Sequence, residues 1–231
     1  ISSFLLIAYW YQRKRSRHGA VKALVITVFG GFAMLLGFMM MYAALGTFSI
    51  RGIVAAADQF ADHSLFLPSM CLILLGALTK SAQFPFHIWL PDAMEAPTPI
   101  SAYLHSATMV KAGVYLVTRF IPVFGGQMEW FWIIVVAGMV TLFWGSFLAI
   151  RQIDLKAMLA FSTVSQLGLI MALLGIGSMA LNPRLSHDTA LMFSGAILAA
   201  MFHLVNHSAF KGTLFMVVGI LDHELGTRDI R

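Results

Sequence analysis

The chain has 231 residues, of which 59% are hydrophobic and only 11% are charged, and its mean hydropathy is +0.84. Soluble domains contain about 25% charged residues, so this composition excludes an ordinary soluble domain and indicates a polytopic membrane protein. The net charge of +5 does not indicate a nucleic-acid partner, because five of the fifteen Lys and Arg residues crowd into residues 12–22, between apolar segments, as is typical of membrane topology.

Long apolar stretches predict an all-α bundle of transmembrane helices. Stretches of more than about 18 apolar residues predict spanning helices, and the chain has neither alternating strand patterns nor Asn-Gly hairpin signals. The predicted elements are a partial helix at 1–11 and helices at 22–46, 65–90, 100–120, 130–150, 157–179 and 190–219. Because the chain begins at Ile1, within an apolar run, we expect residues 1–231 to be an internal fragment of one transmembrane domain.

The basic residues predict which loops share a side of the membrane. Loops of the first set carry nine basic residues and lie at 12–22, 91–99, 150–156 and 220–231. Loops of the second set carry only two and lie at 47–64, 121–129 and 180–189. Since cytoplasmic loops are rich in Lys and Arg, we expect the first set to be cytoplasmic.

The segment 65–90 predicts a broken helix with a lysine close to the break. Pro85 lacks a backbone donor and clashes with the preceding turn, so the helix should break near Phe84–Pro85. Lys80 lies fifteen residues into the segment, and a lysine at that depth costs about 2.5–3.5 kcal/mol. Irregular backbone at membrane depth must be buried in protein or line a wet cavity. We therefore predict a hydrated or ion-binding spot at Lys80, with snorkelling to the headgroups as the alternative.

The helix predicted at 100–120 carries two more titratable side chains. Lys111 lies about 16 Å along this helix, too deep to reach the headgroups easily, and this depth favours a role in an ion pathway. His105 precedes Lys111 by six residues, so the two side chains lie on different faces and should contact different neighbours. The sequence leaves open whether His105 is a relay residue or a packing residue.

The last predicted helix carries a stripe of titratable residues, because His203, His207 and Lys211 recur every four residues. Histidines at i and i+4 can bind zinc, but no third His, Glu or Cys ligand lies near them in the sequence. Imidazole exchanges protons near neutral pH, so a proton wire is favoured over a metal site. Lys156 is ambiguous, since it either belongs to the pathway or faces the headgroups beside a helix that Asp154 caps.

No motif predicts a cofactor, a nucleotide or an enzymatic nucleophile. The chain has no Gly-rich phosphate loop, no Gly-x-Ser-x-Gly sequence and no haem or iron–sulfur ligand pattern. Its single cysteine, Cys71, excludes an internal disulfide. We therefore expect no cofactor, no metal site and no catalytic residue.

Four sequence blocks resemble the antiporter-like superfamily, which contains the Mrp-type multisubunit Na+/H+ antiporters and the proton-pumping membrane subunits of respiratory complex I. The blocks lie at 79–99, 101–113, 154–163 and 202–212. The stretch 219–231 and the pairing of His105 with Lys111 are most similar to the A subunits of the Mrp type. The resemblance implies an inverted-repeat transporter fold with a discontinuous helix near Lys80–Pro85.

The resemblance also implies roles for the titratable residues. Lys80 matches the lysine of the discontinuous helix, which pairs with a glutamate that would stand before Ile1. The positions that match the central polar axis of the family are His105, Lys111, Lys156, His203, His207 and Lys211. The implied function is that of a proton-conducting subunit in a Na+/H+ antiporter complex of a bacterial cell membrane, with other subunits of the complex, the lipid bilayer, H+ and Na+ as its partners.

Two alternatives remain open. The chain could belong to the proton-pumping arm of NADH:quinone oxidoreductase, which NADH-dependent activity of the purified complex would reveal. It could instead be a scaffold that docks partner subunits without transport. A scaffold leaves the buried cationic and imidazole side chains as an unexplained energetic cost.

Overall fold

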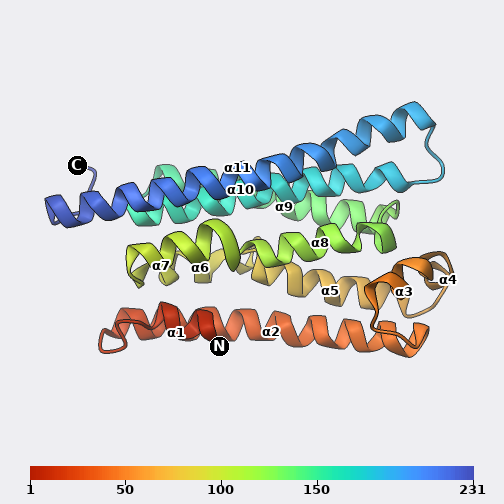
Figure 1. Cartoon of the computed structure of the whole chain (residues 1–231), viewed down its shortest axis with the longest axis horizontal. Helices are drawn as coiled ribbons and strands as arrows, with labels where there is room; N and C mark the ends of the chain where they lie inside the picture. Colours follow the sequence, from red (N-terminus) through yellow and green to blue (C-terminus); the bar gives the residue numbers. More distant parts are fainter.

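The computed structural model describes all of residues 1–231, and it contains helices but no β-strand. The helices lie side by side along the long axis of the molecule (Figure 1). The stretches that are long and apolar enough to cross a membrane are Lys14–Leu45, Thr98–Phe124, Met128–Ile150, Leu155–Leu181 and His187–Leu225. Phe66–Lys80 is a shorter apolar helix. The prediction of an all-α, multi-pass membrane bundle is confirmed.

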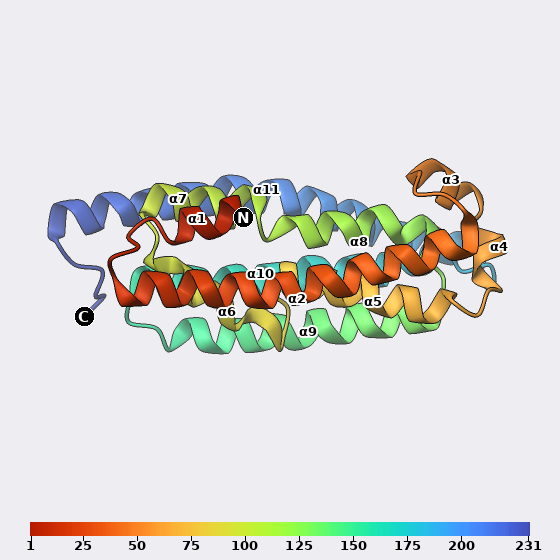
Figure 2. The ribbon, with the colours of Figure 1, turned by 90° about the horizontal axis from the view of Figure 1, so that it is seen from below.

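The chain runs back and forth between two ends of the bundle. The α-helices are α1 (Ser2–Ile7), α2 (Lys14–Leu45), α3 (Ile50–Ala55), α4 (Ala57–Ala61), α5 (Phe66–Lys80), α6 (Trp89–Asp92), α7 (Thr98–Ala102), α8 (Lys111–Phe124), α9 (Met128–Ile150), α10 (Leu155–Ser178) and α11 (His187–Leu225). Short 3-10 turns cover Phe86–Ile88, Ala93–Glu95 and Met179–Leu181. One end of the bundle holds α6, α7 and the C-terminus, and the other end holds α3 and α4 (Figures 1 and 2).

Two helices are longer than their apolar patterns predicted. α2 begins at Lys14, so most of the predicted basic loop at 12–22 is helical instead. Lys, Arg and Ala are good helix formers, and a basic turn can continue a helix beyond the lipid. α11 has 39 residues, against the 30 predicted at 190–219. At 1.5 Å per residue α11 is about 58 Å long, whereas the hydrocarbon core is about 30 Å thick.

The predicted helix break is present, but the helix ends before the proline. α5 ends at Lys80, and the backbone amide of Gln83 donates to the carbonyl of Leu78, which closes the C-terminus. Ala82 adopts a left-handed conformation with φ of 50°, and the Phe84–Pro85 peptide is cis. Helix termination of this kind uses a left-handed residue just after the last turn. The discontinuous helix near Lys80–Pro85 is thereby confirmed.

The predicted helix at 100–120 is also interrupted. Between α7 and α8, residues Tyr103–Thr108 form a π-helical segment that contains His105. The amide of Met109 donates to the carbonyl of Leu104, five residues back, instead of to a carbonyl four residues back. Single π-helical turns occur frequently at functional sites. Hydrophobic periodicity could not reveal this turn, because one extra residue leaves the apolar pattern almost unchanged.

The α10 helix lies at the centre of the bundle. In its apolar window 67% of residues are buried, against 6% in α11 and 28% in α9. α9 approaches α10 through glycines: a Cβ on Gly168 would lie 2.5 Å from the backbone nitrogen of Leu142. Backbones that approach this closely are a general feature of membrane helix packing. Because α10 also packs against α8 and α11, side chains of all three helices meet inside the bundle.

Candidate functional site

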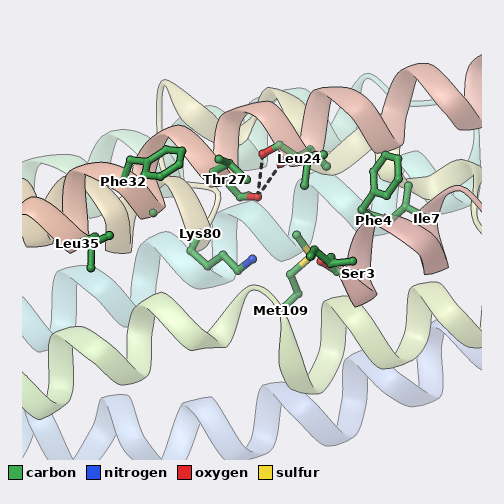
Figure 3. Close-up of a pocket in the computed structure, with 13 residues that line it drawn as sticks. Ser3, Phe4, Ile7, Leu24, Thr27, Phe32, Leu35, Lys80 and Met109 are labelled. Atoms are coloured by element: carbon green, nitrogen blue, oxygen red, sulfur yellow. Dashed lines mark hydrogen bonds between the residues drawn. The ribbon is translucent and has the colours of Figure 1, made fainter.

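Lys80, the last residue of α5, lies beside two cavities. The first has a volume of about 300 Å³ and is bordered by α1, α2, Lys80 and Met109. In Figure 3 the ammonium group of Lys80 points into the space between Thr27 of α2 and Met109. The second cavity, of about 290 Å³, is lined by Lys80 together with Ala112 and Gly113 of α8. Lys80 makes no hydrogen bond or ion pair with another side chain of this chain, and its polar surroundings are these cavities.

Lys111 opens α8 and reaches across to α11. Its ammonium donates to the carbonyl oxygen of Leu204 at 3.0 Å and also to the hydroxyl of Ser208. Only 7% of Lys111 is exposed. A buried ammonium is costly unless its donors are satisfied, and here α11 supplies both acceptors.

The predicted stripe on α11 faces α10. His203 Nε2 lies 2.7 Å from Gln166 Oε1, and Lys211 donates to the carbonyl of Leu159 at 3.2 Å and to Ser162 Oγ. Between them, His207 is fully buried and both of its ring nitrogens lack a partner. The rings of His203 and His207 lie 6.3 Å apart, so they are neighbours without direct hydrogen bonding.

Lys156 lies near the other end of the bundle, in the first turn of α10. Its ammonium donates to the carbonyl oxygen of Ala96 at 2.7 Å, and only 2% of the residue is exposed. Ala96 joins the short helices that follow the break to α7. The side chain therefore points into the bundle, and the alternative that Lys156 faces the headgroups is wrong.

His105 is packed among aromatic rings. Its ring centroid lies 6.4 Å from that of Trp89 and 6.3 Å from that of Phe215. The residue is fully buried and neither ring nitrogen has a partner. As expected from its spacing, His105 contacts neighbours other than those of Lys111.

The structure gathers the seven predicted residues into unequal groups. Lys111, His203, His207 and Lys211 come together where α8, α10 and α11 meet. Lys156 and His105 lie nearer the end that holds α6 and α7, and Lys80 lies on the α2 side of the bundle. No group of three or more His, Cys, Asp or Glu residues is arranged to hold a metal ion.

The partners of the lysines were the part that sequence reasoning missed. Lys111, Lys156 and Lys211 each donate to a main-chain carbonyl of a neighbouring segment, which no side-chain pattern can reveal. Ser162 and Gln166 are visible in the sequence as polar residues within a spanning helix. In contrast, the ion pair of Lys22 and Asp92, at 2.6 Å, joins two segments that the sequence assigned only to the same side.

Known proteins resemble the chain over its whole length. The family model described as NADH:quinone oxidoreductase/Mrp antiporter, transmembrane, matches residues 1–231. Over all 231 residues the chain is 65% identical to the A chain of the Na+/H+ antiporter of Alkalihalophilus pseudofirmus and 59% identical to that of Bacillus subtilis. The chain covers 29% and 28% of these two relatives, so it spans less than a third of their length.

Two solved structures share the fold. The Mrp complex from Dietzia sp. DQ12-45-1b contains a chain that is 39% identical, with a TM-score of 0.85 over 98% of this chain and 23% of that one. The membrane-bound sulfane sulfur reductase, an archaeal respiratory membrane complex, contains a chain that is 26% identical, with a TM-score of 0.84 over 99% of this chain and 44% of that one. Both matches cover nearly the whole bundle.

Proposed function

Since the chain belongs to the NADH:quinone oxidoreductase/Mrp antiporter family, we propose that it forms part of the proton-conducting subunit of a multisubunit antiporter. The complex exchanges cytoplasmic Na+ for external H+ across a bacterial cell membrane. The residues proposed to carry protons are Lys80, His105, Lys111, Lys156, His203, His207 and Lys211. Residues 1–231 form an internal stretch of one antiporter-like transmembrane domain in this proposal.

The observation that carries the proposal is the burial of three lysines in spanning helices. Lys111, Lys156 and Lys211 are 7%, 2% and 2% exposed, and each donates to a carbonyl of a neighbouring segment. Buried ionisable groups in membrane helices are expensive, and they typically mark ion pathways or proton relays. A purely structural role would be served better by apolar side chains of similar volume.

The cavities at Lys80 supply the second support. Ala112 and Gly113 directly follow Lys111 and line one of these cavities, so Lys80 and the start of α8 border the same space. A charge that appears or disappears on Lys80 changes the electrostatic energy of other ammonium groups nearby, because low-dielectric surroundings screen charges weakly. We propose that a carboxylate from outside residues 1–231 joins Lys80 and controls its charge.

A second candidate function is proton pumping by the membrane arm of NADH:quinone oxidoreductase. The family description names both activities, and the fold is shared with a chain of an archaeal respiratory complex. In that case redox chemistry, and not the sodium gradient, would drive the same polar axis. The relatives with 65% and 59% identity are Na+/H+ antiporter subunits, which favours antiport.

The test uses inverted membrane vesicles that contain the complete complex. A pH-sensitive dye follows the pH gradient while Na+ is added to an energised membrane. We expect Na+ to collapse the gradient in the wild type and Lys80→Ala to abolish this response, because the titratable group at the cavity is lost. Lys14→Ala serves as the control, since Lys14 is exposed at the start of α2.

Each outcome of this experiment distinguishes the candidates. Full Na+ response in Lys80→Ala, with normal amounts of complex, contradicts the role of Lys80. Absence of any Na+ response in the wild type, together with NADH-driven acidification that Lys80→Ala removes, supports the respiratory candidate instead.

A further inference from the structure

The residues that follow α11 fold back against the start of α10. Gly226, with φ of 67°, ends α11 and reverses the chain direction. The amide of Leu155 then donates to the carbonyl of Arg228 at 3.0 Å, and the amide of Ile230 donates to the carbonyl of Ile153 at 3.2 Å. We call residues 226–231 the C-terminal strap. The strap satisfies one of the free amide groups that every helix leaves in its first turn.

An ion pair fastens the same strap to the same helix end. Arg228 Nε lies 3.1 Å from Asp154 Oδ2, while Asp154 Oδ1 accepts the amide of Ala157 and caps α10. Arg228 Nε also lies 4.0 Å from Asp222 Oδ1, near the end of α11. One arginine therefore connects the end of α11 with the beginning of α10.

Lys156 lies two residues after Asp154, in the first turn of α10. A cation in the first turn of a helix opposes the helix dipole, and this one is also buried, because only 2% of it is exposed. The arrangement requires compensating groups, and the carbonyl of Ala96 at 2.7 Å supplies one. The rigid attachment of the first turn of α10 then determines whether the ammonium reaches that carbonyl.

We propose that Arg228 and Asp154 are positioning residues that hold Lys156 on the carbonyl of Ala96. Through this contact the strap joins the end of α11 to the segment that follows the helix break. Lys156 thereby sits at a junction of three parts of the chain, the strap, α10 and the segment before α7. The transport consequence rests on the proposed function, but the position of Lys156 does not.

The strap itself offers a matched control. Arg231 Nη2 lies 2.7 Å from Asp229 Oδ2, and Arg231 has no other ion pair. Arg231→Gln therefore removes an arginine and an ion pair from the same six residues without touching α10. Arg228→Gln removes the pair with Asp154, and Arg228→Lys restores the positive charge. Asp154→Asn keeps an oxygen to cap α10 but loses the charge.

The first measurement does not depend on transport. The purified complete complex is treated with a water-soluble amine-acetylating reagent, and acetylation of each lysine is quantified by mass spectrometry. We expect Lys156 acetylation to rise several-fold in Arg228→Gln and Asp154→Asn and to stay at the wild-type level in Arg231→Gln. Lys211, which is equally buried and does not contact the strap, should be unchanged in all variants.

The second measurement is the Na+-dependent collapse of the pH gradient, divided by the amount of assembled complex. Loss of one charged hydrogen bond corresponds to about a tenfold effect, so the maximal rate should fall about tenfold in Arg228→Gln, with little change in the Na+ concentration at half-maximal rate. Arg228→Lys should recover most of that loss.

The outcomes separate the two proposals. Unchanged Lys156 acetylation in both Arg228→Gln and Asp154→Asn overturns the positioning role, whatever the transport result. A wild-type complex without any Na+ response contradicts the proposed function and leaves the acetylation result to decide the role of the strap. If Arg228→Gln does not assemble, Asp154→Asn alone decides it.

Discussion

The lysine on the α2 side of the bundle and the lysines around α10 are held in different ways. Lys80 borders two cavities and has no hydrogen-bond partner in this chain, and close packing of small residues sets its position. Lys111, Lys156 and Lys211 each donate to a main-chain carbonyl of a neighbouring segment. The first arrangement leaves an ammonium free to respond to a new neighbour. The second fixes ammonium groups at set places along a path.

Glycine contacts determine where the end of α5 lies. A Cβ on Gly30 of α2 would lie 1.8 Å from Thr79 Oγ1, directly beside Lys80. A Cβ on Gly113 of α8 would lie 2.2 Å from both the Ala77 carbonyl oxygen and Ser81 Oγ. The end of α5 is thus enclosed between two glycine surfaces, whereas hydrogen bonds connect the helices around α10. Substitutions can test each mode separately.

The largest effect is expected at Gly30. Gly30→Ala should destabilise the bundle by about 1–3 kcal/mol, because the new methyl group overlaps the side chain of Thr79 and α2 must move away from α5. Gly31→Ala is the matched control, since a Cβ there has nothing within 4 Å. Any gain in helix propensity is common to both variants. The measurement is the melting temperature of the detergent-solubilised complex, and equal values for the two variants would contradict the packing argument.

A smaller difference is expected between two lysine-to-leucine variants. Both Lys156→Leu and Lys80→Leu remove an ammonium from apolar surroundings, but only Lys156→Leu also removes a hydrogen bond, the one to Ala96. Lys156→Leu should therefore be less stable than Lys80→Leu by about 1–2 kcal/mol. Thermal unfolding of the two purified complexes measures this difference. A Lys80→Leu variant that is equally or more destabilised would show that Lys80 has a stabilising partner in the complete complex.

The smallest effect is expected at Ser208. Ser208→Ala removes one of the two acceptors of Lys111 and leaves the Leu204 carbonyl, so the loss should be about 0.5–1.5 kcal/mol, accompanied by a few-fold slower Na+-dependent response. Ser194→Ala is the control on the same helix, because its hydroxyl also donates to a carbonyl of α11 and contacts no lysine. Initial rates of dye response in vesicles compare the two. A slower rate in both variants would assign the effect to α11 itself.

The sequence predicted the spans and the break because both depend on local composition. Apolar length defines α9 and α10 to within a few residues, and Pro85 indicates a discontinuity in its neighbourhood. The α5 terminus was misplaced by a few residues, since the left-handed turn at Ala82 has no glycine to reveal it. The π-helical turn at His105 likewise has no compositional signal.

The candidate site was predictable only in its titratable members. Their depth in apolar segments identifies Lys111 and Lys211, and the spacing of four residues places His207 and Lys211 on one stripe. Their acceptors are carbonyl oxygens brought close by tertiary packing, and every residue has a carbonyl. The docking of the strap on α10 is equally invisible, because it pairs main-chain groups of residues about 75 positions apart, such as Leu155 and Arg228.

The length of α11 gives the bilayer a mechanical influence on the bundle. Exposed apolar side chains occur from Leu191 to Leu225 on this helix, a distance of about 51 Å along its axis. An apolar surface longer than the hydrocarbon core produces hydrophobic mismatch, which a helix relieves by tilting or by thickening the lipid around it. Because His203 and Lys211 contact α10 from α11, a thinner membrane that tilts α11 also shifts these contacts. Acyl-chain length is therefore a variable that acts directly on the spacing of the titratable residues.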